Sequence, residues 1–168
     1  MKELLDDLER WRVAGKRAAL ARVVDMKGSG PRDPGAAMAV NEDGEVVGSV
    51  SGGCVEGAVL TEGLSVLRKG EPRLVSYGIA DEDAFSVGLT CGGTIHIFID
   101  PPDETGEAVQ AALATGEPAA LATVIEGPEP GARPGARGVP AKIGAKLLVR
   151  PGAEPIGTLG DPDLDRVV

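Results

Sequence analysis

The chain lacks several features that would place a protein in a class at once. It has 2 cysteines in 168 residues, which excludes the disulfide framework of a small secreted domain. Its net charge is −9 with no basic run, so binding to nucleic acid or an anionic membrane surface is not expected. Its acidic start lacks the apolar core of a signal peptide, and no apolar run reaches the roughly 18 residues of a membrane-spanning helix. These absences predict a reduced, cytoplasmic protein.

Aromatic and histidine side chains are also scarce. With 1 Trp, 1 Tyr and 2 Phe, the core has to be built from Val, Leu, Ile and Ala. The one histidine, His96, alternates with Ile95 and Ile97, which favours a partly exposed strand residue over a catalytic base. The pattern shows no Ser–His–acid set, zinc-ligand spacing or dinucleotide-binding glycine fingerprint. We therefore name no catalytic residues.

Short apolar segments separated by turns make up the rest of the chain, because 25 Gly and 13 Pro punctuate it. Apolar residues at helical spacing predict helices over 3–14, 54–69 and 107–115. Strand patterns are found over 18–26, 36–40, 45–50, 74–77 and 94–99. The segment 78–93 is irregular.

The second half of the chain echoes the first in three places, in the same order and at nearly constant spacing. The matched strings are AALARV (18–23) with AALATV (119–124), GAAMAV (35–40) with GAKLLV (144–149), and GSVSGGCVEGAV (48–59) with GTLGDPDLDRVV (157–168). The sequence therefore predicts an α/β fold: a mixed β-sheet with flanking helices, built from an internal duplication of a helix–strand–hairpin–helix unit. We expect one domain over 1–168, with repeats at about 3–69 and 104–168.

The strongest candidate site is the segment Ser49–Gly57, in which Ser51-Gly52-Gly53-Cys54 marks the change from a predicted strand to a predicted helix. Free N–H groups at a helix start bind anions, and glycines let a phosphate approach the backbone. A thiol at such a place is well situated to react. The alternative is a glycine-rich turn with a small buried cysteine. The second copy has Gly-Asp-Pro-Asp over 160–163, so the glycine pair and the thiol occur only in the first copy, which favours the functional interpretation.

Other candidates are weaker. Cys91 is followed by Gly92 and Gly93, so two thiols in similar settings could line one pocket as metal ligands or as a redox pair; two unrelated buried thiols remain the alternative. Ser29 and Arg32 lie in a loop where a guanidinium suits a phosphate or carboxylate, or is simply solvated. The acidic run 81–83 is more typical of a solvated turn or a helix cap.

Four strings together resemble a known family. They are GSGPRDPGAAMAV, DGEVVGSVSGGCVEGAV, YGIADEDAFSVGLTCGGTIHIFID and GAKLLV followed by GTLGDPDLD. In these strings the chain resembles the N-terminal domain of the xanthine dehydrogenase accessory (XdhC/CoxI) family, most specifically over 48–57 and 88–94. Longer members continue into a C-terminal Rossmann-like domain, which this chain is expected to lack.

The resemblance implies a maturation factor for molybdenum hydroxylases, a chaperone rather than an enzyme. It would bind molybdenum cofactor (molybdopterin) transiently and assist its sulfuration or its insertion into apo-enzymes such as xanthine or carbon monoxide dehydrogenase. The implied partners are an apo-molybdenum hydroxylase, a cysteine desulfurase and a separate Rossmann-domain protein, and we expect a homodimer. The implied cofactor-binding residues are Ser51, Gly52, Gly53, Cys54, Glu56, Cys91, Gly92, Gly93, Ser29 and Arg32, with Cys54 and Cys91 as candidate molybdenum contacts.

The chain departs from the family pattern at two positions. Ala37 stands where the family often has a lysine, and His96 stands where it often has an acid. Two other functions remain open. One is a thiol-based sulfur carrier or redox protein that uses Cys54 and Cys91. The other is a ligand-free regulatory module that binds a molybdoenzyme.

Overall fold

The computed structural model describes residues 2–30, 32–78, 93–127 and 142–168. It divides into two compact units, Met1–Pro102 and Asp103–Val168. The expectation of one domain over 1–168 stays a prediction. None of the helices in these described ranges has the length and apolar character needed to cross a membrane.

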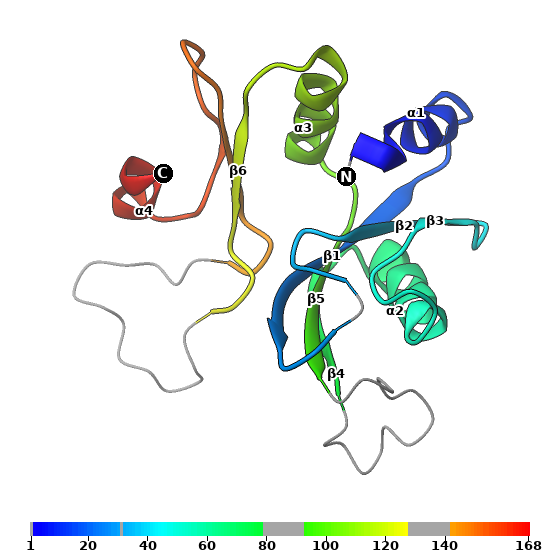
Figure 1. Cartoon of the computed structure of the whole chain (residues 1–168). Coiled ribbons are helices and arrows are strands. Elements are labelled where there is room, and N and C mark those ends of the chain that lie inside the picture. The colour runs from blue at the N-terminus through cyan, green and yellow to red at the C-terminus, as the bar shows by residue number, and fades with distance from the viewer. Residues whose placement is uncertain (1, 31, 79–92, 128–141) are drawn as a thin grey trace. The chain divides into compact units, whose positions relative to one another are not determined.

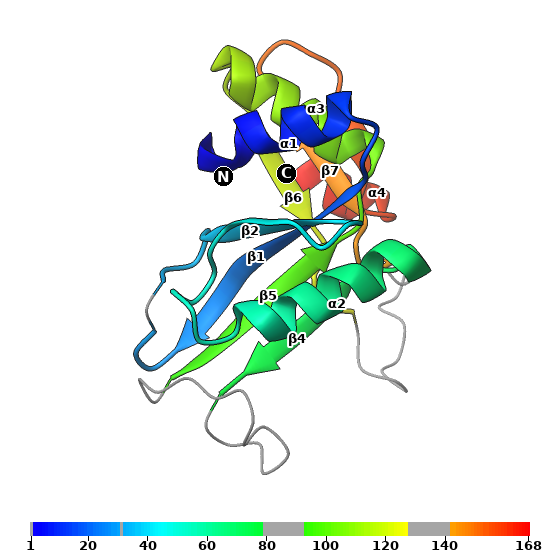
Figure 2. The ribbon, with the colours of Figure 1, turned by 90° about the vertical axis from the view of Figure 1, so that its right-hand side faces the viewer.

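Unit 1 is a five-stranded sheet in the order β3-β2-β1-β5-β4, with a helix on each face (Figures 1 and 2). Its elements are η1 (Lys2–Leu4), α1 (Leu5–Val13), β1 (Ala18–Lys27), β2 (Ala37–Asn41), β3 (Val46–Gly48), α2 (Glu56–Lys69), β4 (Arg73–Tyr77) and β5 (Thr94–Asp100). The predicted helices and strands of this part are therefore present, with ends that shift by a few residues.

Successive side chains of β1 point to opposite faces of the sheet, so the core of unit 1 consists of two clusters. Ala19, Ala21 and Val23 face the main cluster, where α2 contributes Val59 and Val66 and β5 contributes its alternate isoleucines. The side chains on the opposite face join a smaller cluster formed by Leu4, Leu8, Trp11, Ala37 and Ala39. Aliphatic residues dominate both clusters, as the scarcity of aromatic side chains requires.

Unit 2 is a three-stranded sheet in the order β6-β7-β8, flanked by helices. Its elements are α3 (Glu104–Thr115), β6 (Ala120–Thr123), β7 (Lys146–Val149), β8 (Ile156–Thr158) and α4 (Pro162–Val167). Asp103 caps α3 by accepting from Gly106 N–H, and its other oxygen accepts from the buried Lys146 ammonium at 2.8 Å. This carboxylate therefore joins the start of α3 to β7.

The α/β class with flanking helices is confirmed, but the mixed sheet is not what the structure shows. Every strand pair in the described residues is antiparallel. The crossover expected in a mixed sheet is present, because α2 connects β3 to β4 and these two strands run in the same direction. However, β3 and β4 form opposite edges of the sheet, so the crossover produces no parallel neighbours.

The strand registers of the two units agree with the sequence matches. In unit 1, Ala19 pairs with Val40; in unit 2, the residues matched to them, Ala120 and Val149, pair with each other. The next strand pair behaves alike, since Ala39 with Val47 corresponds to Leu148 with Ile156. A common origin of the two units stays an interpretation of the sequence.

Candidate functional site

The predicted site residues that the structure describes lie near one end of the sheet in unit 1. β1 ends there and β5 begins there, because Lys27 pairs with Thr94. β4 ends there too, since Tyr77 pairs with Ile95, and β3 ends beside the start of β2. The loop after β1, the turn after β3 and Gly93 before β5 therefore lie on the same side of the sheet, as the strand directions require.

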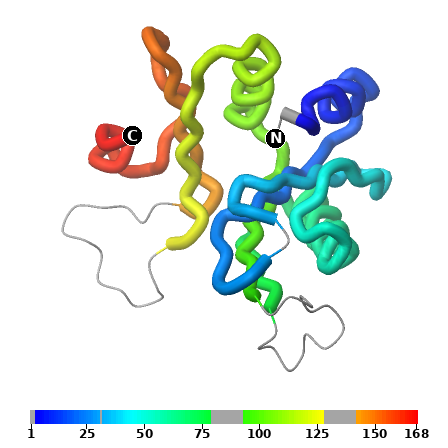
Figure 3. The backbone as a smooth tube through the Cα atoms, viewed as in Figure 1, coloured from blue at the N-terminus to red at the C-terminus, as the bar shows by residue number. Residues whose placement is uncertain are grey.

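Residues 49–53 form the turn that follows β3 and leads toward α2 (Figure 3 shows its path). Several groups of this turn donate hydrogen bonds to the carboxylate of Glu56. The hydrogen bonds to Oε1 come from Ser49 Oγ (2.7 Å), Val50 N–H (3.2 Å) and Ser51 N–H (2.9 Å). Those to Oε2 come from Ser51 Oγ and Gly53 N–H (2.8 Å). The two hydroxyls also accept, from Gly52 N–H and Val55 N–H respectively, each at 2.9 Å. The 49–53 turn is thus a network around one anionic side chain.

The electrostatics of Glu56 reflect this network. Partial burial raises the pKa of its carboxyl, but the hydrogen bonds from the Ser51 and Ser49 hydroxyls and from backbone N–H groups outweigh that effect. The net result is a pKa lowered from 4.5 to about 2. Glu56 is therefore ionised at neutral pH, and the negative charge at the start of α2 also interacts favourably with the helix dipole.

This arrangement changes how the predicted anion site can work. The N–H groups of Ser51 and Gly53, predicted to meet a ligand's phosphate, donate to the protein's own Glu56. Gly53 has a φ of 115°, a conformation that side chains on other residues rarely allow, although a Cβ there would meet no atom within 4 Å. The glycine is thus demanded by backbone conformation and leaves open space beside Cys54.

Cys54 itself lies two residues before α2, not at its first residue as predicted. Its thiol is free and half-buried, and it packs against the main core cluster of unit 1. No group of three or more His, Cys, Asp or Glu side chains placed to hold a metal occurs within the described stretches of the chain. A soft metal would therefore meet Cys54 as a single thiol ligand from this part of the molecule.

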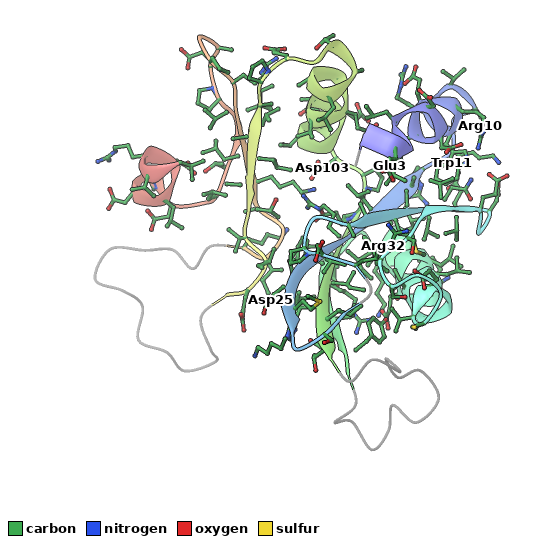
Figure 4. All side chains as sticks on the ribbon, in the orientation of Figure 1. Glu3, Arg10, Trp11, Asp25, Arg32 and Asp103 are labelled. Atoms are coloured by element: carbon green, nitrogen blue, oxygen red, sulfur yellow. The ribbon has the colours of Figure 1, made fainter. Side chains whose placement is uncertain are left out.

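The loop candidates form a second group at the same end of the sheet. Gly93 lies directly against Ser29, because a Cβ on Gly93 would come within 2.0 Å of the Ser29 carbonyl oxygen. Arg32 is exposed in the connection between β1 and β2 (labelled in Figure 4). Among the described residues, no hydrogen bond joins this loop to the 49–53 turn. Cys91, Gly92 and the acidic run 81–83 lie outside the described residues.

Two features of the structure involve residues that were not among the predicted cofactor-binding residues. Ser49 is the first donor to Glu56, and its spacing from Ser51 and Glu56 is the signal that could have indicated it. The second is a Ser–His–Asp set on adjacent strands: Ser76 Oγ lies 2.7 Å from His96 Nδ1, and Asp25 Oδ2 lies 4.0 Å from Nε2. The His–Asp separation exceeds a hydrogen bond and Ser76 is exposed, so this set lacks the alignment that activates a nucleophile.

Three relatives align with about half of the chain. The chain is 42% identical over 87 residues to the Molybdenum cofactor insertion chaperone PaoD of Escherichia coli. It is 34% identical over 99 residues to a probable xanthine dehydrogenase subunit of Bacillus subtilis, and 43% identical over 81 residues to the Uncharacterized protein YqeB of Escherichia coli. These alignments cover 52%, 58% and 48% of this chain but 27%, 28% and 15% of the relatives, so it matches a minor part of each.

The fold has a counterpart among solved structures. A crystal structure of a xanthine dehydrogenase from Bacillus halodurans superposes with a TM-score of 0.68 at 22% identity, over 91% of this chain and 44% of that one. At this identity the likeness speaks for the fold alone. The model of the XdhC and CoxI family matches residues 11–78, which include β1 to β4, the 49–53 turn and Cys54. Over these residues, the chain is similar to the XdhC and CoxI family.

Proposed function

We propose that this chain is a maturation factor for a molybdenum hydroxylase, which binds molybdenum cofactor as cargo and assists its sulfuration or insertion into the apo-enzyme. The observation that carries the proposal is Cys54, a free and half-buried thiol next to a glycine that its turn requires, within the segment shared with the family. The relative named a molybdenum cofactor insertion chaperone aligns with about half of the chain, which supports this role.

The residues of unit 1 fit the cargo in part. A thiolate is a suitable ligand for a soft metal centre, so Cys54 is the proposed contact to molybdenum. The phosphate of the cofactor needs a separate contact, because Ser51 and Gly53 already donate to Glu56. We assign that contact to Arg32, whose exposed guanidinium can form paired hydrogen bonds with phosphate oxygens. Neither assignment calls for a catalytic base.

The proposed partner is an apo-molybdenum hydroxylase of the xanthine or carbon monoxide dehydrogenase type. A cysteine desulfurase as sulfur source, a separate Rossmann-domain protein and self-association into a homodimer belong to the same hypothesis. The relative whose name describes a xanthine dehydrogenase component supports a hydroxylase as the client. The net charge of −9 does not oppose binding of an anionic cofactor if contacts are local.

The test is to purify the chain from cells that make molybdenum cofactor and to assay molybdenum and released pterin. We expect the wild-type chain to carry pterin and the Cys54→Ser variant to lose it. Asp163→Ser is the matched control, because Asp163 holds the position of Cys54 in the second copy, and it should retain pterin at the wild-type level. Background pterin in the wild-type chain, equal to that of Cys54→Ser, would refute the proposal.

A further inference from the structure

The residues on both sides of Cys54 depend on one carboxylate. Gly53 donates its N–H to Glu56 Oε2 at 2.8 Å. Val55 donates its N–H to the Ser51 hydroxyl at 2.9 Å, and that hydroxyl donates to the same Oε2. The backbone that carries the thiol is therefore held before the cysteine by Glu56 directly and after it through one hydroxyl.

Ordinary stabilisation of the strand end needs fewer of these contacts. In unit 2, Asp165 holds the matched position, and its carboxylate accepts from Thr158 Oγ at 2.6 Å and from Leu159 N–H at 2.7 Å. These two bonds correspond to those that Glu56 makes with Ser49 and Val50. The further hydrogen bonds of Glu56, those from Ser51 and Gly53, have no counterpart at Asp165. They occur in unit 1, where the turn leads to a thiol.

We propose that Glu56 is a positioning residue for Cys54: its longer carboxylate holds the backbone on both sides of the cysteine and so keeps the thiol at one place at the end of the sheet. Glu56 does not contact the cargo in this scheme, because its two oxygens accept hydrogen bonds from within the turn. The inference deepens the proposed function and rests on it, since Cys54 is there the contact to molybdenum.

The experiment compares Glu56→Gln, Glu56→Asp and the matched control Asp165→Asn in the full chain. The rate of Cys54 alkylation by iodoacetamide is followed by peptide mass spectrometry, which separates Cys54 from Cys91. Glu56→Asp is the informative variant, because a side chain of that length can still make the two bonds that Asp165 makes but falls short of Gly53. We expect a small fall in melting temperature and faster alkylation in Glu56→Asp, still faster alkylation in Glu56→Gln, and the wild-type rate in Asp165→Asn.

Wild-type alkylation rates in folded Glu56→Asp would overturn the positioning role, whether or not Glu56→Gln folds, and so would equal acceleration in Asp165→Asn. A second readout is the pterin bound by each variant, with an expected loss in Glu56→Asp of about 10–100-fold, as for residues that orient a metal ligand. If the wild-type chain carries no pterin, the proposed function fails, while the alkylation rates still decide the role of Glu56.

Discussion

The turn after β3 in unit 1 and the turn after β8 in unit 2 begin in the same way. In each, a hydroxyl and the next N–H donate to a carboxylate seven residues beyond the hydroxyl: Ser49 to Glu56, and Thr158 to Asp165. They then diverge. The first passes through two glycines to a cysteine, whereas the second passes through Asp161, which accepts from the N–H groups of residues 163 and 164 as the cap of α4.

The comparison distinguishes the hydrogen bonds common to both strand ends from those found only beside Cys54. Position 51 in the first copy supplies a hydroxyl that Gly160 lacks, and Gly53 supplies an N–H that Pro162 lacks. The donors that extend the network to Cys54 are therefore the residues that differ between the copies. A carboxylate at the helix start is common to both turns, and its extension toward a thiol is specific to unit 1.

The largest expected effect on stability is that of introducing into the turn of unit 1 the proline that unit 2 has at the matched position. Gly53→Pro should lower the free energy of unfolding by about 3 kcal/mol or more, because proline is incompatible with a φ of 115° and removes an N–H bonded to a carboxylate. Urea unfolding measures the loss. The reciprocal Pro162→Gly should change stability far less, and equal losses for the two variants would show that the turns are equivalent.

Removing the charge of Glu56 should have an intermediate effect. Glu56→Gln is expected to lower the free energy of unfolding by about 1–2 kcal/mol, in the lower part of the range for charged hydrogen bonds because the side chain is partly exposed. Asp165→Asn should cost less, since Asp165 accepts fewer bonds. Chemical denaturation of both variants tests the order, and a larger loss for Asp165→Asn would contradict it.

Acid should reduce the difference between wild type and Glu56→Gln. The pKa of Glu56 in the folded chain, about 2, lies below its ordinary value of 4.5, so the stability it contributes is complete above pH 4.5 and is lost as pH falls toward 2. Urea titrations at neutral pH and at several points across this window should show the two curves converging. A constant difference across the window would mean that the carboxylate charge is not what stabilises the turn.

The smallest expected effect is that of the thiol on stability. Cys54→Ser should change the free energy of unfolding by less than about 1 kcal/mol, because the side chain is small and only half-buried against the core. Asp163→Ser should leave the free energy of unfolding nearly unchanged, because Asp163 is exposed in the second copy. Differential scanning fluorimetry of the two variants suffices. A marked loss for Cys54→Ser would favour the structural interpretation of this cysteine over the functional one.

Much of the fold was predictable from the chain alone. Helical spacing indicated α1, α2 and α3, and apolar alternation indicated the strands of unit 1, because these elements form from neighbours in sequence. The pairing pattern was not predictable to the same degree. A crossover helix suggested parallel neighbours, but which strands lie side by side depends on the whole sheet, and β3 and β4 lie at its opposite edges.

The candidate site was predictable as a place but not as a mechanism. Two glycines before Cys54 indicated a special turn, and the second copy indicated that the turn was not merely structural. The same pattern suggested backbone N–H groups free for a ligand. The expectation that Glu56 meets a cofactor stays a prediction, and in the structure its carboxylate accepts hydrogen bonds from two of those N–H groups. The Ser76, His96 and Asp25 set depended on strand register and so had no signal along the chain.

The sequence by itself determined the residue types at the two turns: a hydroxyl and a carboxylate in both, and glycines and a thiol in one. It also determined the charge and the elements, because these depend on composition and local spacing. The tertiary structure decided which donors meet which acceptor. A carboxylate close to the N–H groups of a turn can accept their hydrogen bonds, so that no ligand is needed to do so. The fold of residues 49–56 brings the Glu56 carboxylate within hydrogen-bond distance of these donors.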